Sequence, residues 1–501
     1  GDVLVFSYVG FSAQEVTVGS QNTINVVLIS SNELDEVLVT GYGSQAQKEI
    51  TSAVVSVSED EFNKGAITDA SELLQGKVAG LSIYNRGGDP NAGTVIRLRG
   101  LTTIGSNTSP LIVVDGVIGA SLQNVDPQDI ESINVLKDAS AAAIYGSRGS
   151  SGVLLVTTKK GVAGETQLSY NGRFESSTIA NQIDVMSPSE FVANGGRDLG
   201  SQTDWLDAVT REGFSQIHNL TASGGAGNST YRVSANFTED QGILENSGFD
   251  QFNTRLSFQT SALNDRLKIG FSAAFIQRNQ ENGFRESMRY ATLYNPTAPI
   301  YAVDAPYAFN GAQFGGYFET LGLFDSYNPV SIINQNINDG EARTINYGIN
   351  LEYDLTDSIT AYFRSSTQSS DYANRVYFRT TSLWNNNDGY GGADSPVRKG
   401  AAEFYEQNSD FQLNELYATW KKSTDNMNLA VTAGYSYQKE NFNQAFFALG
   451  DFPGDEIDYI DAIEYSQDLL NAGQINANSD RSPDTEIDAF FARLNMTIAN
   501  N

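Results

Sequence analysis

Apolar and polar residues alternate one by one in several runs of the second part of the chain. The clearest runs cover residues 231–237, 267–275, 344–353, 429–438 and 490–498. A period of two places neighbouring side chains on opposite faces of a β-strand. Here one face is apolar with many aromatics and the other is polar, over about ten residues, the length of a tilted strand that crosses a bilayer. The pattern predicts membrane-spanning strands between lipid and a lumen, although the strands of a soluble sandwich also alternate.

The connections between these runs alternate in length. Short turns are expected at residues 224–228, 262–266, 355–358 and 423–426. Long segments are expected at residues 176–215, 279–341, 371–409 and 441–485. Short turns on one side and long loops on the other are typical of an up-and-down membrane barrel. We count about ten such strands, too few for a barrel that encloses a domain of about a hundred residues.

The first part of the chain has a different pattern, with short elements and frequent turn residues. Strands are expected at residues 94–98, 111–114 and 153–158. Short helical segments are expected after three N-cap aspartates. These aspartates are Asp69, with Glu72 completing a capping box, Asp126, followed by proline, and Asp138, before residues 139–145. Short alternating runs in residues 1–32 predict part of a small β-sandwich.

Composition excludes several functional classes. The chain has 501 residues, of which 40% are hydrophobic, but no run approaches the roughly 18 apolar residues of a membrane-spanning helix. A formal net charge of −29 argues against a nucleic-acid partner. With no cysteine and a single histidine, His218, a disulfide framework and a Cys/His zinc site are excluded. We expect His218 to lie on the surface or in the strand wall, and we predict no catalytic residue, cofactor or metal site.

Several segments carry a specific family resemblance. They read LDEVLVTGYG from Leu34, IRLRG from Ile96, PLIVVDGV from Pro110, and DIESINVLKDASAAAIYGSRGSSGVLLVTTKKG from Asp129 to Gly161. Together they closely resemble the SusC/RagA-type TonB-dependent outer-membrane transporters of Bacteroidota. The resemblance implies an all-β transmembrane barrel, with 22 strands in the full protein and about half of them here, around an N-terminal mixed α/β plug domain.

The resemblance also divides the chain. Residues 1–32 would be the end of a carboxypeptidase regulatory-like β-sandwich, and residues 33–48 a linker. Residues 49–161 would be the plug, and residues 162–501 the N-terminal portion of the barrel with long extracellular loops. We therefore expect the sequence to be part of a longer protein.

The implied activity is active import of a large nutrient, an oligosaccharide or a peptide, and not an enzymatic reaction. The implied partners are the periplasmic protein TonB, a SusD-like surface lipoprotein acting as a lid, and outer-membrane lipid. TonB would bind the TonB box by strand addition. This box is Asp35, Glu36, Val37, Leu38, Val39 and Thr40. Two alternatives stay open: an ordinary interdomain strand at this position, and a TonB-linked receptor for signalling or protein binding.

Two groups of side chains are further candidates. The first could form ion pairs that fix the plug in a polar lumen, or could be separately solvated charges. It comprises Arg86, Arg97, Arg99, Asp115, Lys137, Asp138 and Arg148. The second, Tyr317, Trp384 and Tyr390, lies on long loops beside Asn, Asp and Gly, where aromatics either stack on sugar rings or pack against other loops. The carboxylates of residues 451–468 lack a regular calcium-loop spacing, so a solvated acidic loop is expected.

Overall fold

The structure is a computed structural model that describes most of the chain. The described residues are 3–6, 14–17, 26, 37–39, 44–46, 54–65, 67–85, 88–101, 108–138, 143–302, 308–321, 326–384, 400–424, 426–455, 463–472 and 476–498.

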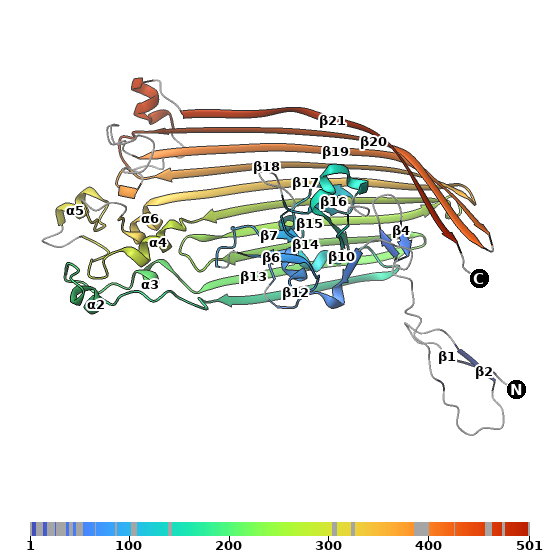
Figure 1. The fold of residues 1–501 in the computed structure, drawn as a ribbon, viewed down its shortest axis with the longest axis horizontal. Coiled ribbons are helices and arrows are strands. Elements are labelled where there is room, and N and C mark those ends of the chain that lie inside the picture. The colour runs from blue at the N-terminus through green and yellow to red at the C-terminus, as the bar shows by residue number, and fades with distance from the viewer. Residues whose placement is uncertain are drawn as a thin grey trace.

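Ten long antiparallel strands form one sheet, which we call the wall (Figure 1). They are β12 (Gly164–Ser177), β13 (Gly213–Ala226), β14 (Ser229–Gln241), β15 (Ser247–Ala262), β16 (Leu267–Asn282), β17 (Asn336–Thr356), β18 (Ile359–Phe378), β19 (Ala401–Thr424), β20 (Met427–Gly450) and β21 (Asn476–Ile498). Each strand pairs with the next along the chain, so that β12 and β21 are the edges of the described sheet. This is the up-and-down order that the connection lengths predicted.

The wall strands are longer than predicted. They contain 13 residues in β14 and up to 24 in β19 and β20, whereas the alternating runs suggested about ten. Only the part of a strand that faces lipid needs a strict alternation. The hydrogen-bonded hairpins continue beyond it, so that β17 already begins at Asn336 and β18 extends to Phe378. The long connections are correspondingly shorter than expected.

The two faces of the wall have opposite chemistry. Large apolar side chains are exposed on one face: Phe214, Leu220, Val233, Phe237, Phe252, Leu256, Phe271, Ile345 and Tyr347. Polar side chains are buried on the other: Ser215, Asn219, Thr221, Ser234, Asn236, Gln251, Asn253, Arg278 and Thr344. A soluble sheet buries its apolar face, so this inversion fits a wall with lipid outside and a polar interior. His218 lies in this wall on the apolar face, where its ring stacks on Tyr170 at 6.1 Å between centroids, as the sequence predicted.

Helices occupy the connections at one end of the wall, at the left of Figure 1. They are α2 (Pro188–Ala193), α3 (Trp205–Val209), α4 (Glu286–Leu293), α5 (Ala308–Gln313) and α6 (Pro329–Gln335). Residues of α3, α4 and α6 share a hydrophobic cluster that includes Trp205, Ala291 and Ile333. The opposite end carries the tight turns, so the two ends differ as the sequence predicted. Among the described helices, none is long and apolar enough to span a membrane.

A second, five-stranded sheet lies against the polar face of the wall, and we call this part the plug, following the resemblance. Its strand order is β5 (Val54–Ser58), β10 (Ile130–Leu136), β11 (Val153–Thr158), β8 (Leu111–Val114) and β9 (Val117–Ile118). A separate hairpin pairs β6 (Leu81–Tyr84) with β7 (Val95–Leu98). The strands expected at 94–98, 111–114 and 153–158 are therefore confirmed within one residue. Apolar side chains of both parts, including Leu74, Ile96, Ile130, Ile133 and Leu154, form one buried core.

Two of the predicted N-caps are present. The Asp126 carboxylate accepts a hydrogen bond from Gln128 N at 2.7 Å and begins a 3₁₀ turn at Pro127–Asp129. Asp69 likewise caps the 3₁₀ segment Ala70–Leu74. The predicted capping box is wrong, because the Glu72 carboxylate accepts a hydrogen bond from the Asn85 amide instead. Residues 139–142 of the third predicted helix lie outside the described residues.

The N-terminal part contains two small hairpins. One pairs β1 (Val3–Phe6) with β2 (Gln14–Thr17), and the other pairs β3 (Val37–Val39) with β4 (Ser44–Ala46). The assignment of residues 1–32 to a β-sandwich remains a prediction.

Candidate functional site: the interface between plug and wall

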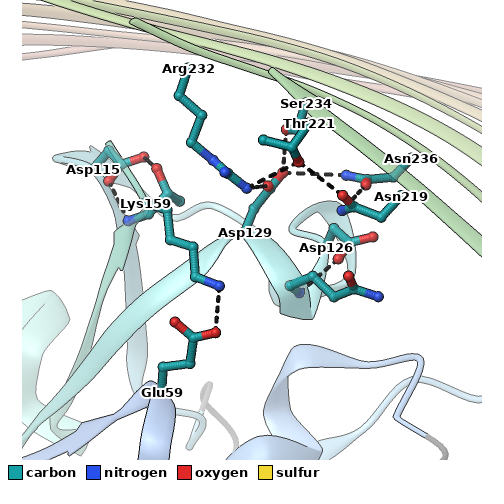
Figure 2. Close-up of polar contacts among 12 residues, drawn as sticks. Glu59, Asp115, Asp126, Asp129, Lys159, Asn219, Thr221, Arg232, Ser234 and Asn236 are labelled. Atoms are coloured by element: carbon teal, nitrogen blue, oxygen red, sulfur yellow. Dashed lines mark hydrogen bonds and ion pairs between the residues drawn. The ribbon is translucent and has the colours of Figure 1, made fainter. Parts of the chain in front are cut away.

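Asp129 is the centre of the polar contact between plug and wall (Figure 2). It directly precedes β10 and is 2% exposed. One of its carboxylate oxygens accepts a hydrogen bond from an Arg232 Nη at 2.7 Å. The other accepts hydrogen bonds from Ser234 Oγ at 2.6 Å and Asn236 Nδ2 at 3.3 Å. All three donors are alternate residues of β14, so a single strand presents a preformed socket for one carboxylate.

A second buried carboxylate lies beside this socket. Burial, and secondarily the nearby Asp129 charge, raise the pKa of Asp126 from 3.8 to about 7. The hydrogen bond from Gln128 N, together with the charges of Arg173 and Lys159, opposes the increase. Asp126 can therefore change its protonation state near neutral pH, at the point where the plug meets the wall.

Asp115 makes a second anchor at the end of β8. Its carboxylate accepts hydrogen bonds from Thr158 N at 2.9 Å and Thr158 Oγ1 at 2.7 Å, which close the plug sheet. It also pairs with Arg255 of β15 at 3.2 Å. Both charged side chains are largely buried, at 18% and 12% exposed. The Asp115 side chain thus both stabilises the plug sheet and attaches the plug to the wall.

The attachment is a row of arginines on the polar face of neighbouring strands. Arg173 of β12 donates to the backbone carbonyls of Gly65 and Ile67 at 2.6 and 2.9 Å. Arg278 of β16 donates to the Pro90 carbonyl at 3.2 Å. With Arg232 and Arg255, four of the strands from β12 to β16 each direct an arginine to the plug. A guanidinium group that donates to carboxylates and carbonyls makes directional hydrogen bonds. These contacts hold the plug without requiring apolar packing at the interface.

One part of the interface is apolar. Phe411 and Leu413 of β19 pack against the face of the plug sheet that carries Val113, Val153 and Leu155. The opposite face of this sheet covers the plug's own core. The plug is therefore a folded unit with its own core, held by polar anchors and by this apolar contact.

A cavity of about 420 Å³ lies between the plug and the helical end of the wall. The plug contributes Asp89 and Asn91. The wall and its connections contribute Asn282, Gly283, Phe284, Arg285, Glu286, Asn338, Tyr372, Asn374, Val376, Phe378, Trp384 and Glu403. The amides are linked to each other, since Asn374 Nδ2 donates to Asn338 Oδ1 at 2.9 Å. Amides, carboxylates and aromatic rings are the groups that bind polar, uncharged chains such as sugars and peptide backbones.

Comparison with known proteins identifies the family. Residues 46–153 match the family model of the TonB-dependent receptor plug domain. The TonB-dependent receptor SusC of Bacteroides thetaiotaomicron is 37% identical over 344 residues, which are 64% of this chain and 34% of SusC. TonB-dependent receptor P3 of Formosa agariphila is 32% identical over 520 residues, covering 99% of this chain and 49% of P3. The chain belongs to the SusC/RagA-type TonB-dependent receptors. The resemblance on which the plug motifs were interpreted is confirmed.

The fold agrees with this SusC/RagA assignment. The RagAB peptide importer in its closed-closed state superimposes with a TM-score of 0.72 and 18% identity, over 90% of this chain and 54% of that one. The predicted fold class, a plug inside the antiparallel strands of a TonB-dependent barrel, is thus confirmed. The chain spans about half the length, or less, of the curated relatives it matches.

The predicted plug charges divide into two groups. Asp115 contacts the wall as described, and Arg148 donates to Gln438 of β20 at 2.6 Å. The others contact the plug itself. Arg99 pairs with Asp138 at 2.7 Å, Lys137 donates to the Ala79 carbonyl, and Arg97 donates to Ser109 Oγ. For these four residues the described contacts lie within the plug, so their anchoring to the wall remains a prediction. Arg86 lies outside the described residues.

The other candidates are only partly covered by the structure. Within the TonB box, Val37, Leu38 and Val39 form β3, whereas Asp35, Glu36 and Thr40 lie outside the described residues. Trp384 lines the cavity and packs edge-on to Phe284 at 5.4 Å between centroids. Tyr317 contacts Tyr301 at 5.2 Å between ring centroids and is not among the described residues that line the cavity, and Tyr390 lies outside the described residues. Among the described residues, no group of three or more acidic or histidine side chains could hold a metal ion.

Sequence reasoning missed the most buried anchor, Asp129, and its socket on β14. A signal was present, because Arg232, Ser234 and Asn236 occupy consecutive polar positions of an alternating run. Arginine on the lumen side of neighbouring strands needs an acidic or carbonyl partner, and the plug is the nearest source.

Proposed function

We propose that the complete protein imports a large nutrient, an oligosaccharide or a peptide, across the outer membrane in a TonB-dependent manner. The observation that carries this proposal is the attachment of the plug. A domain with its own core occupies the polar face of a wall whose other face is apolar, and directional polar contacts hold it there. Such a domain blocks the lumen at rest and can be displaced by applied force without losing every contact at once.

The relatives support the partners and the place of action. SusC and P3 are named TonB-dependent receptors, and the RagAB structure is described as a peptide importer. We infer an outer-membrane location, energy supplied by TonB at residues 35–40, and a SusD-like lipoprotein as the second subunit. The protein would bind and move its cargo without covalent chemistry, so no residue is assigned a catalytic role.

The test is growth of the source cell on a panel of glycans and peptides as sole nutrient. Cells with the intact gene are compared with cells whose protein lacks residues 35–40, and outer-membrane abundance is measured in both. Loss of growth on one polymer class, with abundance unchanged, supports energised import and names the cargo. Equal growth on every polymer would refute import and favour a TonB-linked receptor with a signalling or protein-binding role.

A further inference from the structure

We propose that Arg278 and Arg285 are positioning residues that hold a loop of the plug, Gly88–Ala92, as the floor of the cavity. Ligand binding and seating of the plug are then thermodynamically linked. Displacement of the loop dismantles the cavity and releases its ligand into the lumen. This inference rests on the proposed import function, because it takes the cavity to be a site for the cargo.

The loop follows the wall closely. Gly88 has φ +75°, and its carbonyl accepts a hydrogen bond from Ile243 N at 3.1 Å. A Cβ at this position would lie 2.6 Å from the Ile243 side chain, so only glycine permits this approach. Asn91 Nδ2 donates to two wall carbonyls, those of Gly248 at 2.7 Å and Glu281 at 2.8 Å.

Arg278 of β16 holds the loop against the wall. Its side chain is 6% exposed and its guanidinium lies 3.5 Å from the centre of the Phe249 ring. The guanidinium donates to the Pro90 carbonyl at 3.2 Å and to Asn91 Oδ1 at 3.1 Å. A buried guanidinium is costly unless its donors are used, so Arg278 favours the seated loop.

Arg285 fixes the loop from the cavity side. Its Nε lies 3.3 Å from Asp89 Oδ2, and the Asp89 side chain is only 10% exposed. The same aspartate holds its own loop, since Asp89 Oδ1 accepts a hydrogen bond from Asn91 N at 2.9 Å. Asp89, Asn91 and Arg285 all line the cavity.

A ligand in this cavity touches two bodies at once. Its floor belongs to the plug, whereas its sides belong to β16–β19 and to the start of α4. A ligand with contacts to both binds the seated plug better than the displaced plug. By linkage it must stabilise the seated state by the same factor. When force on the plug displaces residues 88–92, the affinity of the cavity for its ligand therefore falls as the lumen opens.

The test uses the full-length protein in lipid nanodiscs and hydrogen exchange of residues 88–92. The variants are Arg278→Gln and Arg285→Gln. The matched control is Lys268→Gln, which removes a 2.7 Å ion pair with Glu352 within the wall. We expect exchange to rise about tenfold in Arg278→Gln, which loses charged hydrogen bonds. We expect a rise of about threefold in Arg285→Gln, whose pair is half-exposed, and wild-type exchange in the control.

The second arm adds two probes to the wild-type protein, a pool of short maltodextrins and a tryptic digest of casein. Binding is measured by equilibrium dialysis. We expect the pool that binds to slow exchange of residues 88–92, and to bind at least about fivefold more weakly to Arg278→Gln. Binding with unchanged loop exchange overturns the linkage and leaves import standing. Binding by neither pool overturns the linkage for these probes, whereas import itself is decided by the growth experiment. Wild-type exchange in both arginine variants overturns the positioning role.

Discussion

Replacement of Asp129 by asparagine tests whether the plug is held by its buried polar anchor. The substitution keeps the side-chain shape but replaces one carboxylate oxygen by an amide NH₂ group. This group is itself a donor and would face the donors of β14. Arg232, at 14% exposed, then has no charged partner at this position. Loss of one member of a buried ion pair costs about 3–5 kcal/mol. Because Arg232 keeps some solvent access, we expect the lower end, about 3 kcal/mol, which is roughly 150-fold in the opening equilibrium.

The assay is hydrogen exchange of β10 in the full-length protein, since β10 begins directly after Asp129. In Asp129→Asn, the β10 amides should exchange roughly 150-fold faster under conditions where exchange follows the opening equilibrium. The control is Arg99→Gln, which breaks an exposed pair within the plug (52% and 34% exposed) and should cost about 1 kcal/mol or less. Wild-type exchange in Asp129→Asn, or an equal effect of Arg99→Gln, would refute the assignment of Asp129 as the principal anchor.

Three further predictions test other parts of the structure. The folded plug binds a proton at Asp126 that the unfolded chain loses above pH 3.8, so plug stability should fall as pH rises from about 4 to 7. Asp126→Asn, which can still cap the turn, should abolish this fall and be more stable than wild type near pH 8 by urea unfolding. Ile133→Ala, at a fully buried core position, should cost about 2–5 kcal/mol in the same unfolding experiment. Leu220→Lys on the apolar face should reduce outer-membrane abundance, since a mid-membrane lysine costs about 2–4 kcal/mol. Gln259→Lys, on the polar face opposite Thr230 and Gly270, should leave abundance near wild type, and equal abundance of the two variants would contradict the assignment of the faces.

The wall could be predicted from the sequence because one physical constraint acts on each residue separately. Lipid on one side and a polar interior on the other impose alternation of apolar and polar residues on every strand. This alternation is visible in a single sequence. Strand length was underestimated because the constraint ends where the lipid ends. Beyond that point the backbone hydrogen bonds alone continue the hairpin, and they leave no side-chain pattern.

The anchors could be predicted only in part, because a pair of charges is a property of two positions far apart in sequence. Asp115 was found since it lies within a family motif, although its partner Arg255 lies 140 residues away. Arg99 and Asp138 were equally prominent, but they pair with each other at the plug surface. Sequence alone shows that a charge needs a partner. Only the position of the plug against particular strands shows which partner it has.

The topology of the plug relates its attachment to the direction of force. The linker, residues 33–48, precedes β5 along the chain. Among the described strands, β5 lies at the edge of the plug sheet and pairs with β10. Force applied at the linker therefore acts first on one row of hydrogen bonds, between β5 and β10. The next strand, β10, is held at its start by the Asp129 socket and at its other side by β11. The buried anchor Asp129 thus lies at the start of the strand next to β5, so we expect the plug sheet to stay attached beyond β5 until the contacts of Asp129 with β14 are broken.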